Sequence, residues 1–174
     1  MRRKKWWVPG VGVAVIIGAA TLASASVVGK AAPALVIQEL SGKDFDLSKL
    51  RGKVVVVSFW ATWCPPCQAE MPMLDAVYRR YRGLGLEMIG LSADRPHDRD
   101  DAIKMAQANS YPEAILSDAQ TNEFGSPSTL PLTFVIDRTG TVRFKFTEDT
   151  TPVTEAKLSA AVAQLLAEHP TAKP

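Results

Sequence analysis

Residues 54–59 read Val-Val-Val-Val-Ser-Phe, the strongest β-branched run in the chain. Because this run is apolar almost throughout rather than at every second position, it indicates a strand buried on both faces of a sheet. Residues 86–92 have a similar continuous pattern and predict a second strand of this kind. Weaker strand signals at residues 35–47 flank a turn at residues 41–43. The chain is therefore expected to fold around a buried sheet.

Two stretches with apolar residues three and four positions apart predict long helices. The first begins at a pair of prolines, residues 65–66, because proline suits the first helical turn, and it ends at Gly83 or Gly85. A shorter helix is expected at residues 100–107. The last helix begins near residue 151. Its buried face consists of Leu158, Ala161, Val162, Leu165 and Leu166.

A β-hairpin is predicted at residues 132–147, where two strand-like runs flank Asp-Arg-Thr-Gly. Strict alternation in its second strand would place Val142, Phe144 and Phe146 on one face. A short strand is expected before it, at residues 114–116. Strands that alternate with helices and end in a hairpin and a helix indicate a single mixed α/β domain.

The charge of the chain is concentrated at its N-terminus. The formal charge is +2, but residues 1–25 hold four basic residues and no acidic ones, which leaves 16 basic and 18 acidic residues elsewhere. Because residues 26–174 are so close to neutral, their charge gives no electrostatic basis for binding nucleic acid. Apolar residues make up 47% and charged residues 22%, an ordinary globular balance.

The N-terminal segment has the pattern of a targeting sequence. Four basic residues precede an uncharged stretch at residues 6–29, which includes Ala23-Ser24-Ala25. This is either a secretory signal cleaved after Ala25 or an uncleaved anchor, because the stretch is long enough to cross a hydrocarbon layer of about 30 Å. Both interpretations place the domain outside the cytoplasmic membrane. The expected order is a signal peptide or membrane anchor at 1–29, a linker at 30–34, a folded domain at 35–169 and a tail at 170–174.

Cys64 and Cys67 are the only cysteines, and they directly follow the predicted central strand. Two cysteines this close do not close a long loop, and the distant His97 and His169 lack the spacing of zinc ligands. At the start of a helix the pair can form a small disulfide, and the helix N-terminus favours a thiolate on Cys64. Cys64 is therefore the predicted nucleophile and Cys67 the resolving thiol of a redox pair that needs no further cofactor.

Residues 58–72 read Ser-Phe-Trp-Ala-Thr-Trp-Cys-Pro-Pro-Cys-Gln-Ala-Glu-Met-Pro, which resembles the active-site stretch of the TlpA/ResA/CcmG-type thioredoxin-like proteins. The resemblance extends over residues 33–168 and includes the Gly-Lys before the central strand and the Phe-Val-Ile-Asp hairpin. It implies a thioredoxin-like domain at 35–169. The implied fold is a central mixed sheet flanked by helices, with a helix inserted after the second core strand. Proteins of this family are exported, often membrane-tethered reductases.

The resemblance also implies roles for single residues. Pro131 matches a cis-proline that packs beside the disulfide, and Leu130 belongs to the neighbouring backbone that pairs with substrate. Trp63 is expected to shield the disulfide and to form an apolar docking surface. Glu70 lies one helical turn beyond Cys67 and is a candidate for proton transfer, with a solvent-facing helix charge as the alternative.

Three further expectations concern residues around the motif. Trp60 is assigned to the core. Ser58 stands where thioredoxins place a buried aspartate, so it can form hydrogen bonds but cannot act as a buried base. The acidic residues between Asp94 and Asp101 are interpreted as a solvated loop at the start of a helix.

The favoured function is reduction of protein disulfides. The motif has no histidine to stabilise the reduced thiolate, and its two prolines withhold N–H donors. The resemblance implies a membrane electron donor of DsbD or CcdA type, and substrates such as apocytochrome c or a copper-site assembly protein. One alternative is a copper-binding chaperone that uses the two cysteines with Met71 or Met73. Another is a peroxidase of the same fold, whose Pro-x-x-x-Thr-x-x-Cys signature is broken by Ala61.

Overall fold

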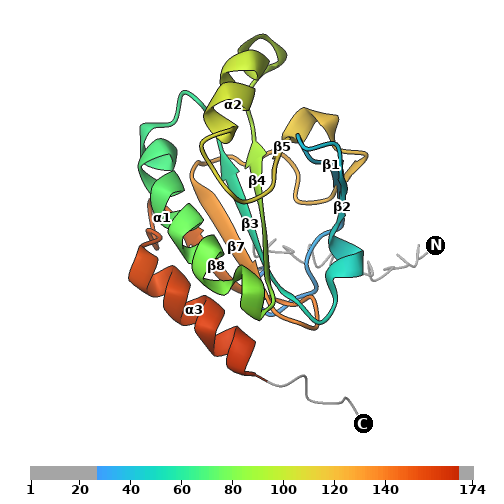
Figure 1. The fold of residues 1–174 in the computed structure, drawn as a ribbon, viewed down its shortest axis with the longest axis vertical. Helices are drawn as coiled ribbons and strands as arrows, with labels where there is room; N and C mark the ends of the chain where they lie inside the picture. Colours follow the sequence, from blue (N-terminus) through green and yellow to red (C-terminus); the bar gives the residue numbers. More distant parts are fainter. Residues whose placement is uncertain (1–26, 169–174) are drawn as a thin grey trace, which may run out of the picture.

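A five-stranded mixed sheet forms the centre of the protein in the computed structural model, which describes residues 27–168 (Figure 1). Its strands are β3 (Val54–Trp60), β4 (Leu86–Ser92), β5 (Glu113–Ile115), β7 (Leu132–Ile136) and β8 (Val142–Thr147). The order across the sheet is β5-β4-β3-β7-β8. The pairs β3–β4 and β4–β5 are parallel, whereas β3–β7 and β7–β8 are antiparallel. The predicted mixed sheet is confirmed.

The central strand β3 is buried along its whole length, as its continuous apolar run predicts. Its side chains alternate between two cores. Val54 and Val56 pack with the helices on one side of the sheet. Val55, Val57 and Phe59 pack on the other side. The sequence shows no alternation here because both faces are covered.

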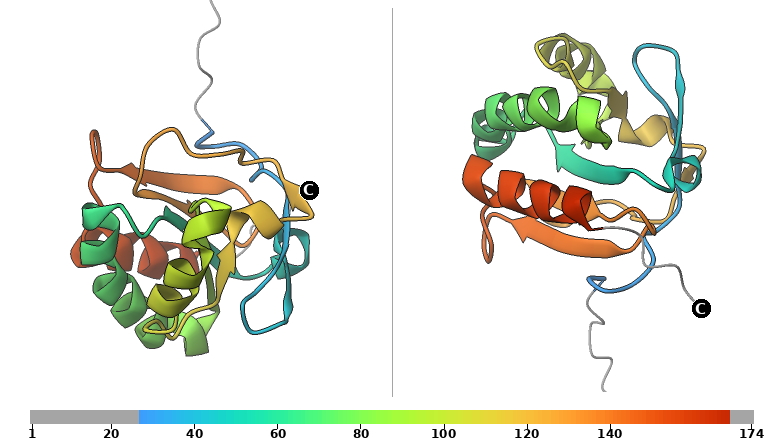
Figure 2. Two further views of the ribbon diagram at one scale, coloured as in Figure 1. Left: turned by 90° about the horizontal axis from the view of Figure 1, so that it is seen from above. Right: turned by 60° about the horizontal axis from the view of Figure 1, so that its bottom comes forward.

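Residues 27–168 contain three α-helices, two of which cover one face of the central sheet (Figure 2). Helices α1 (Pro65–Tyr81) and α3 (Glu155–Ala167) lie side by side over one face and share a hydrophobic core with β3. Helix α2 (Arg99–Ala106) stands between β4 and β5 in the chain and is the expected insertion. Short 3-10 helices occur at Leu47–Leu50, Arg82–Leu84, Pro96–Asp98 and Leu116–Asp118.

The opposite face of the sheet is covered by a small antiparallel sheet in the order β2-β1-β6. It consists of β1 (Leu35–Gln38), β2 (Asp44–Asp46) and β6 (Thr121–Asn122). Leu35, Ile37 and Phe45 of this sheet pack against the β3 side chains that face away from α1. Strand β6 has only two residues, which is too short to leave a signal in the sequence.

The second hairpin strand corrects the prediction that Val142, Phe144 and Phe146 share one face. Val142 pairs with Ile136 while Phe144 pairs with Val135, so β8 contains one unpaired extra residue at position 143. Such a bulge reverses the alternation of side chains. Val142 therefore packs in the core next to the small sheet, whereas Phe146 packs with the helices.

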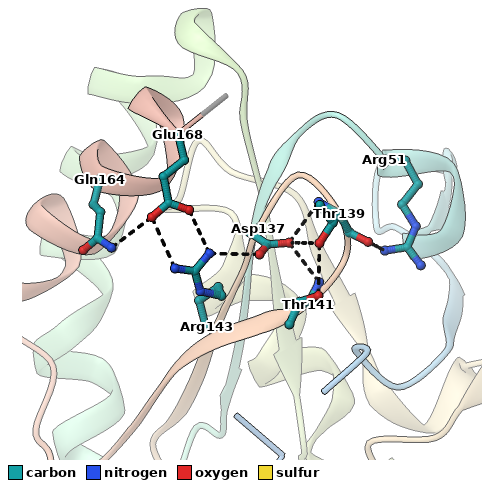
Figure 3. Close-up of polar contacts among 7 residues, drawn as sticks. All are labelled: Arg51, Asp137, Thr139, Thr141, Arg143, Gln164 and Glu168. Carbon is teal, nitrogen blue, oxygen red and sulfur yellow. Dashed lines mark hydrogen bonds and ion pairs between the residues drawn. The ribbon is translucent and has the colours of Figure 1, made fainter. Parts of the chain in front are cut away.

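The bulge directs Arg143 toward the end of α3 (Figure 3). Arg143 Nη1 lies 2.8 Å from Glu168 Oε2 and 3.1 Å from Asp137 Oδ2. Gln164 Nε2 donates to Glu168 Oε1 at 3.0 Å, and Asp137 Oδ1 accepts the backbone N–H of Thr139 at 2.9 Å. These contacts join the hairpin turn to the C-terminal helix. Because these charged groups are partly exposed, their ion pairs contribute little to the free energy of folding. Their main effect is to hold the hairpin turn against the end of α3.

The predicted targeting segment at 1–29 and the tail at 170–174 lie largely outside the described residues. Where the description begins, the chain already contacts the hairpin, since Gly29 N–H donates to the Val142 carbonyl at 2.8 Å. Ala32 N–H donates to the Gly140 carbonyl, also at 2.8 Å. Within residues 27–168, no helix combines the length and the apolar character needed to cross a membrane.

Candidate redox site

Cys64 and Cys67 form a disulfide at the start of α1, with their Cα atoms 5.3 Å apart. Cys64 caps the helix, and the Cys67 N–H donates to Cys64 Sγ at 3.3 Å. The local reason is that β3 ends at Trp60 and the prolines at 65–66 occupy the first helical turn, where no N–H donor is required. A thiolate on Cys64 would therefore meet the positive end of the helix dipole.

The disulfide is shielded by apolar side chains, which leave Cys64 and Cys67 4% and 2% exposed. They share a core cluster with Trp60 and Met71, and Leu130 packs against that cluster. The Leu130–Pro131 peptide bond is cis, as the resemblance implies. Tertiary folding thus brings a segment more than sixty residues downstream to the cysteines.

Trp63 has the exposure expected of a docking surface, since 61% of the residue is open to solvent. It borders a groove of about 670 Å³ together with Thr62 and the α2 residues Asp101, Lys104 and Met105. The inserted helix α2 therefore lines this groove together with Trp63. Trp60, in contrast, is buried, as predicted.

Glu70 is buried in the first half of α1, so the interpretation of it as a solvent-facing charge is wrong. Its Oε2 atom lacks a hydrogen-bond partner among the described residues. Burial raises the pKa of Glu70 to about 7, and the negative charge of Glu148 acts in the same direction. Glu70 lines a small recess together with Pro131 and Thr133. Such a carboxyl can bind and release a proton near neutral pH.

Ser58 is buried in β3 and forms a hydrogen bond, as expected from the sequence. Its Oγ atom lies 3.1 Å from Thr133 Oγ1, a residue of the neighbouring strand β7. The two hydroxyls satisfy each other, so no charged group is needed at this position.

Asp94 is buried, which corrects its assignment to a solvated loop. Its carboxylate accepts the Thr62 N–H at 3.0 Å and the Thr62 hydroxyl at 2.6 Å. Ser92 Oγ donates to it at 2.8 Å. Because β3 and β4 are parallel, their C-terminal ends meet, and Asp94 satisfies the loop that carries Trp63. The position of Asp94 two residues after a predicted buried strand was the signal that could have identified it.

The short strand predicted at residues 114–116 omits Glu113, a residue that no sequence pattern singled out. The structure includes Glu113 in β5 and leaves it 5% exposed. Trp60 Nε1 donates to Oε2 at 2.8 Å, and Asn109 Nδ2 donates to Oε1 at 2.7 Å. Burial raises the pKa of Glu113 to about 7, against the smaller opposing effect of these hydrogen bonds. An isolated glutamate next to apolar residues does not indicate in the sequence that it is buried or that it accepts hydrogen bonds from Trp60 and Asn109.

The two methionines considered as copper ligands lie in different cores. Met71 packs with the cysteines, whereas Met73 packs in the cluster between α1 and α3. Among residues 27–168, no three His, Cys, Asp or Glu side chains are grouped so that they could hold a metal ion.

Comparison with known proteins identifies the wider family. The AhpC/TSA family model matches residues 28–145. The chain is 38% identical over 117 residues to the thiol-disulfide oxidoreductase ResA of Bacillus cereus, and the match spans 66% of each chain. It is 32% identical to the ResA protein of Geobacillus kaustophilus over 133 residues, 76% of each chain. Its structure is similar to that of a thiol:disulfide interchange protein from Chlorobium tepidum, with a TM-score of 0.64, 27% identity, and coverage of 82% of this chain and 99% of that chain.

Proposed function

Because this chain belongs to the AhpC/TSA family and is similar to thiol-disulfide oxidoreductases, we propose that it is a dithiol reductant of protein disulfides outside the cytoplasm. The observation that carries the proposal is the disulfide at the N-terminus of α1, beside the exposed Trp63. As an oxidoreductase of thioredoxin-like fold, the protein uses the cysteine pair itself as its redox group.

The reduced protein delivers two electrons in two exchange steps. The Cys64 thiolate attacks one sulfur of the substrate disulfide, so that a mixed disulfide forms and one substrate thiolate leaves. The Cys67 thiolate then attacks Cys64 Sγ, which releases the second substrate thiolate and forms the Cys64–Cys67 disulfide. The substrate has gained two electrons and takes up two protons, and a donor must reduce the pair again.

The direction of electron flow follows from how weakly the site stabilises a thiolate. Cys67 N–H donates to Cys64 Sγ, but the two intervening residues are prolines and have no N–H to offer. The motif also lacks the histidine with which strong oxidants of this fold stabilise their reduced form. The balance between disulfide and dithiol therefore favours the disulfide, as a reductant requires.

A redox titration of the full-length chain tests this direction. The fraction of Cys64–Cys67 disulfide is measured at equilibrium in buffers of reduced and oxidised dithiothreitol or glutathione. We expect a midpoint potential well below that of strong oxidants such as DsbA, which lies at about −120 mV. A midpoint near that value would contradict the role as a reductant.

We propose that the substrate segment binds across Trp63, Leu130 and Pro131. Trp63 offers an exposed aromatic surface, and Leu130, which precedes the cis-proline, packs against the cluster that contains both cysteines. The location outside the cytoplasm is supported by the basic and then uncharged segment at 1–29. We further propose a membrane electron donor of DsbD or CcdA type, and as substrates apocytochrome c or a copper-site assembly protein. The N-terminal segment would hold the protein at the membrane if it remains uncleaved.

Glu70 is proposed to take up and return the proton of a cysteine during exchange. It is buried one helical turn from Cys67, and its pKa of about 7 allows both protonation states near neutral pH. Replacing Glu70 with glutamine should remove one titration near pH 7 from the profile of thiol exchange rate against pH. Glu148→Gln is the matched control, because it removes a neighbouring negative charge and should move that titration to lower pH. Superimposable profiles for Glu70→Gln and the parent would contradict the role.

A further inference from the structure

Glu113 connects to the redox site through one hydrogen bond. Its Oε2 atom accepts Trp60 Nε1–H at 2.8 Å. Trp60 belongs to the same packed cluster as Cys64 and Cys67. The carboxyl group is therefore linked to the cluster around the two cysteines through the indole of Trp60.

The space for this carboxylate depends on a glycine in the neighbouring strand. Gly90 of β4 pairs with Glu113 of β5, and a Cβ atom at Gly90 would lie 2.1 Å from Glu113 Oε2. Alanine or any larger residue would therefore displace the carboxylate from the indole. The absence of a side chain at Gly90 thus leaves the space in which the Glu113 carboxylate reaches Trp60.

A buried carboxyl group costs free energy when it is ionised, and an apolar side chain could fill a strand position at lower cost. Both oxygens of Glu113 are used as acceptors, one by Trp60 and one by Asn109. The arrangement orients the indole rather than completing a hydrophobic core. This distinguishes Glu113 from its neighbours Ala114 and Ile115, which only pack.

We propose that Glu113 is a positioning residue of the redox centre, which holds the Trp60 indole against the Cys64–Cys67 pair and acts on the sulfurs through that ring. The indole controls how far water reaches the sulfurs. Shielding from water disfavours the thiolate, so the position of the ring affects both the thiol acidity of Cys64 and the disulfide–dithiol equilibrium. The inference rests on the proposed redox function and assigns an additional residue to it.

Other ionisable groups near Glu113 come from three elements, and the test keeps all of them unchanged. Tyr111 precedes it in the chain and lines the same cavity. Asp75 of α1 contacts the segment between α2 and β5, because its Oδ1 atom accepts the Ser110 N–H at 2.7 Å. Glu39 and Lys43 lie in the β1–β2 turn across that cavity.

The test compares Glu113→Gln with a rescue variant, Glu113→Gln combined with Asn109→Asp. Glutamine can accept from Trp60, but its amide N–H₂ group then faces the Asn109 amide donor, so one hydrogen bond is lost. The second substitution restores an acceptor at position 109. We measure the equilibrium constant with glutathione and the pH profile of Cys64 alkylation in the full-length reduced chain. The single variant should change the equilibrium constant about fivefold, and the rescue variant should return it to within about twofold of the parent.

A double-mutant cycle with Trp60→Phe identifies the route of the effect. Trp60→Phe alone should also change the equilibrium constant about fivefold, since phenylalanine cannot donate to Glu113. In that background Glu113→Gln should have no further effect. An unchanged equilibrium and alkylation profile in Trp60→Phe, an additive effect of the two changes, or a failure of the rescue variant would each overturn the proposal. If the parent pair does not exchange with glutathione at all, the proposed redox function itself fails, which is a separate result.

Discussion

Replacing Cys64 with serine is expected to lower the rate of protein-disulfide reduction by a factor of about a thousand or more. The hydroxyl of serine is a far weaker nucleophile than a thiolate near neutral pH, so the first exchange step is lost. Cys64 caps α1, and serine is a good capping residue, so the fold should be retained. The rate is measured by the appearance of thiols in a reporter protein disulfide, with the chain reduced beforehand.

Cys67→Ala is the matched variant, and it should behave differently. The first exchange proceeds, but no thiol is left to resolve it, so the mixed disulfide with the substrate accumulates on Cys64. Capture of these complexes in intact cells of the native host identifies the substrates and tests the location. Trapped proteins of the cytoplasm would contradict the extracytoplasmic role. Unchanged activity of the Cys64→Ser variant would contradict the mechanism.

The free energy of unfolding is expected to fall by about 3 kcal/mol between pH 4.5 and pH 8 because of Glu113 alone. Burial raises its pKa from the usual 4.5 to about 7 in the folded chain. Between these values the folded state holds a proton that the unfolded state has lost, so stability decreases as pH rises. Below pH 4.5 the contribution is fully present, and above about pH 7 it is gone. Glu70, whose pKa is raised in the same direction, adds to the slope.

Denaturant unfolding of the oxidised chain at several pH values measures this slope. Glu113→Gln should flatten it, because an amide does not titrate. Glu87→Gln on the neighbouring strand β4 is the control for the exchange of one carboxyl for an amide at a partly exposed position. A slope in Glu113→Gln equal to that of the parent would contradict the assignment.

Local patterns in the sequence predicted the central elements of the fold, whereas features that depend on strand pairing left no local pattern. The continuous apolar runs at Val54–Trp60 and Leu86–Ser92 predicted two core strands, and the structure confirms both. The two prolines marked the start of α1, but the helix ends at Tyr81, before the predicted stop at Gly83 or Gly85. A 3-10 turn at Arg82–Leu84 continues to Gly85, which has a positive φ of 106°. The bulge at Arg143 was not predictable, because it depends on how β8 pairs with β7 and leaves the local residue types unchanged.

The chain by itself determined the chemistry of the protein. A strand, two cysteines separated by two prolines and a helix are contiguous, so the position of the sulfurs at a helix N-terminus follows from short-range order. The tertiary structure alone decided which groups surround those sulfurs. Asp94 and Glu113 are 30 and 49 positions from Cys64. They contact the site because parallel pairing places β4 and β5 alongside the C-terminal end of β3. The partners of both residues and the raised pKa of Glu113 depend on burial that no local pattern records.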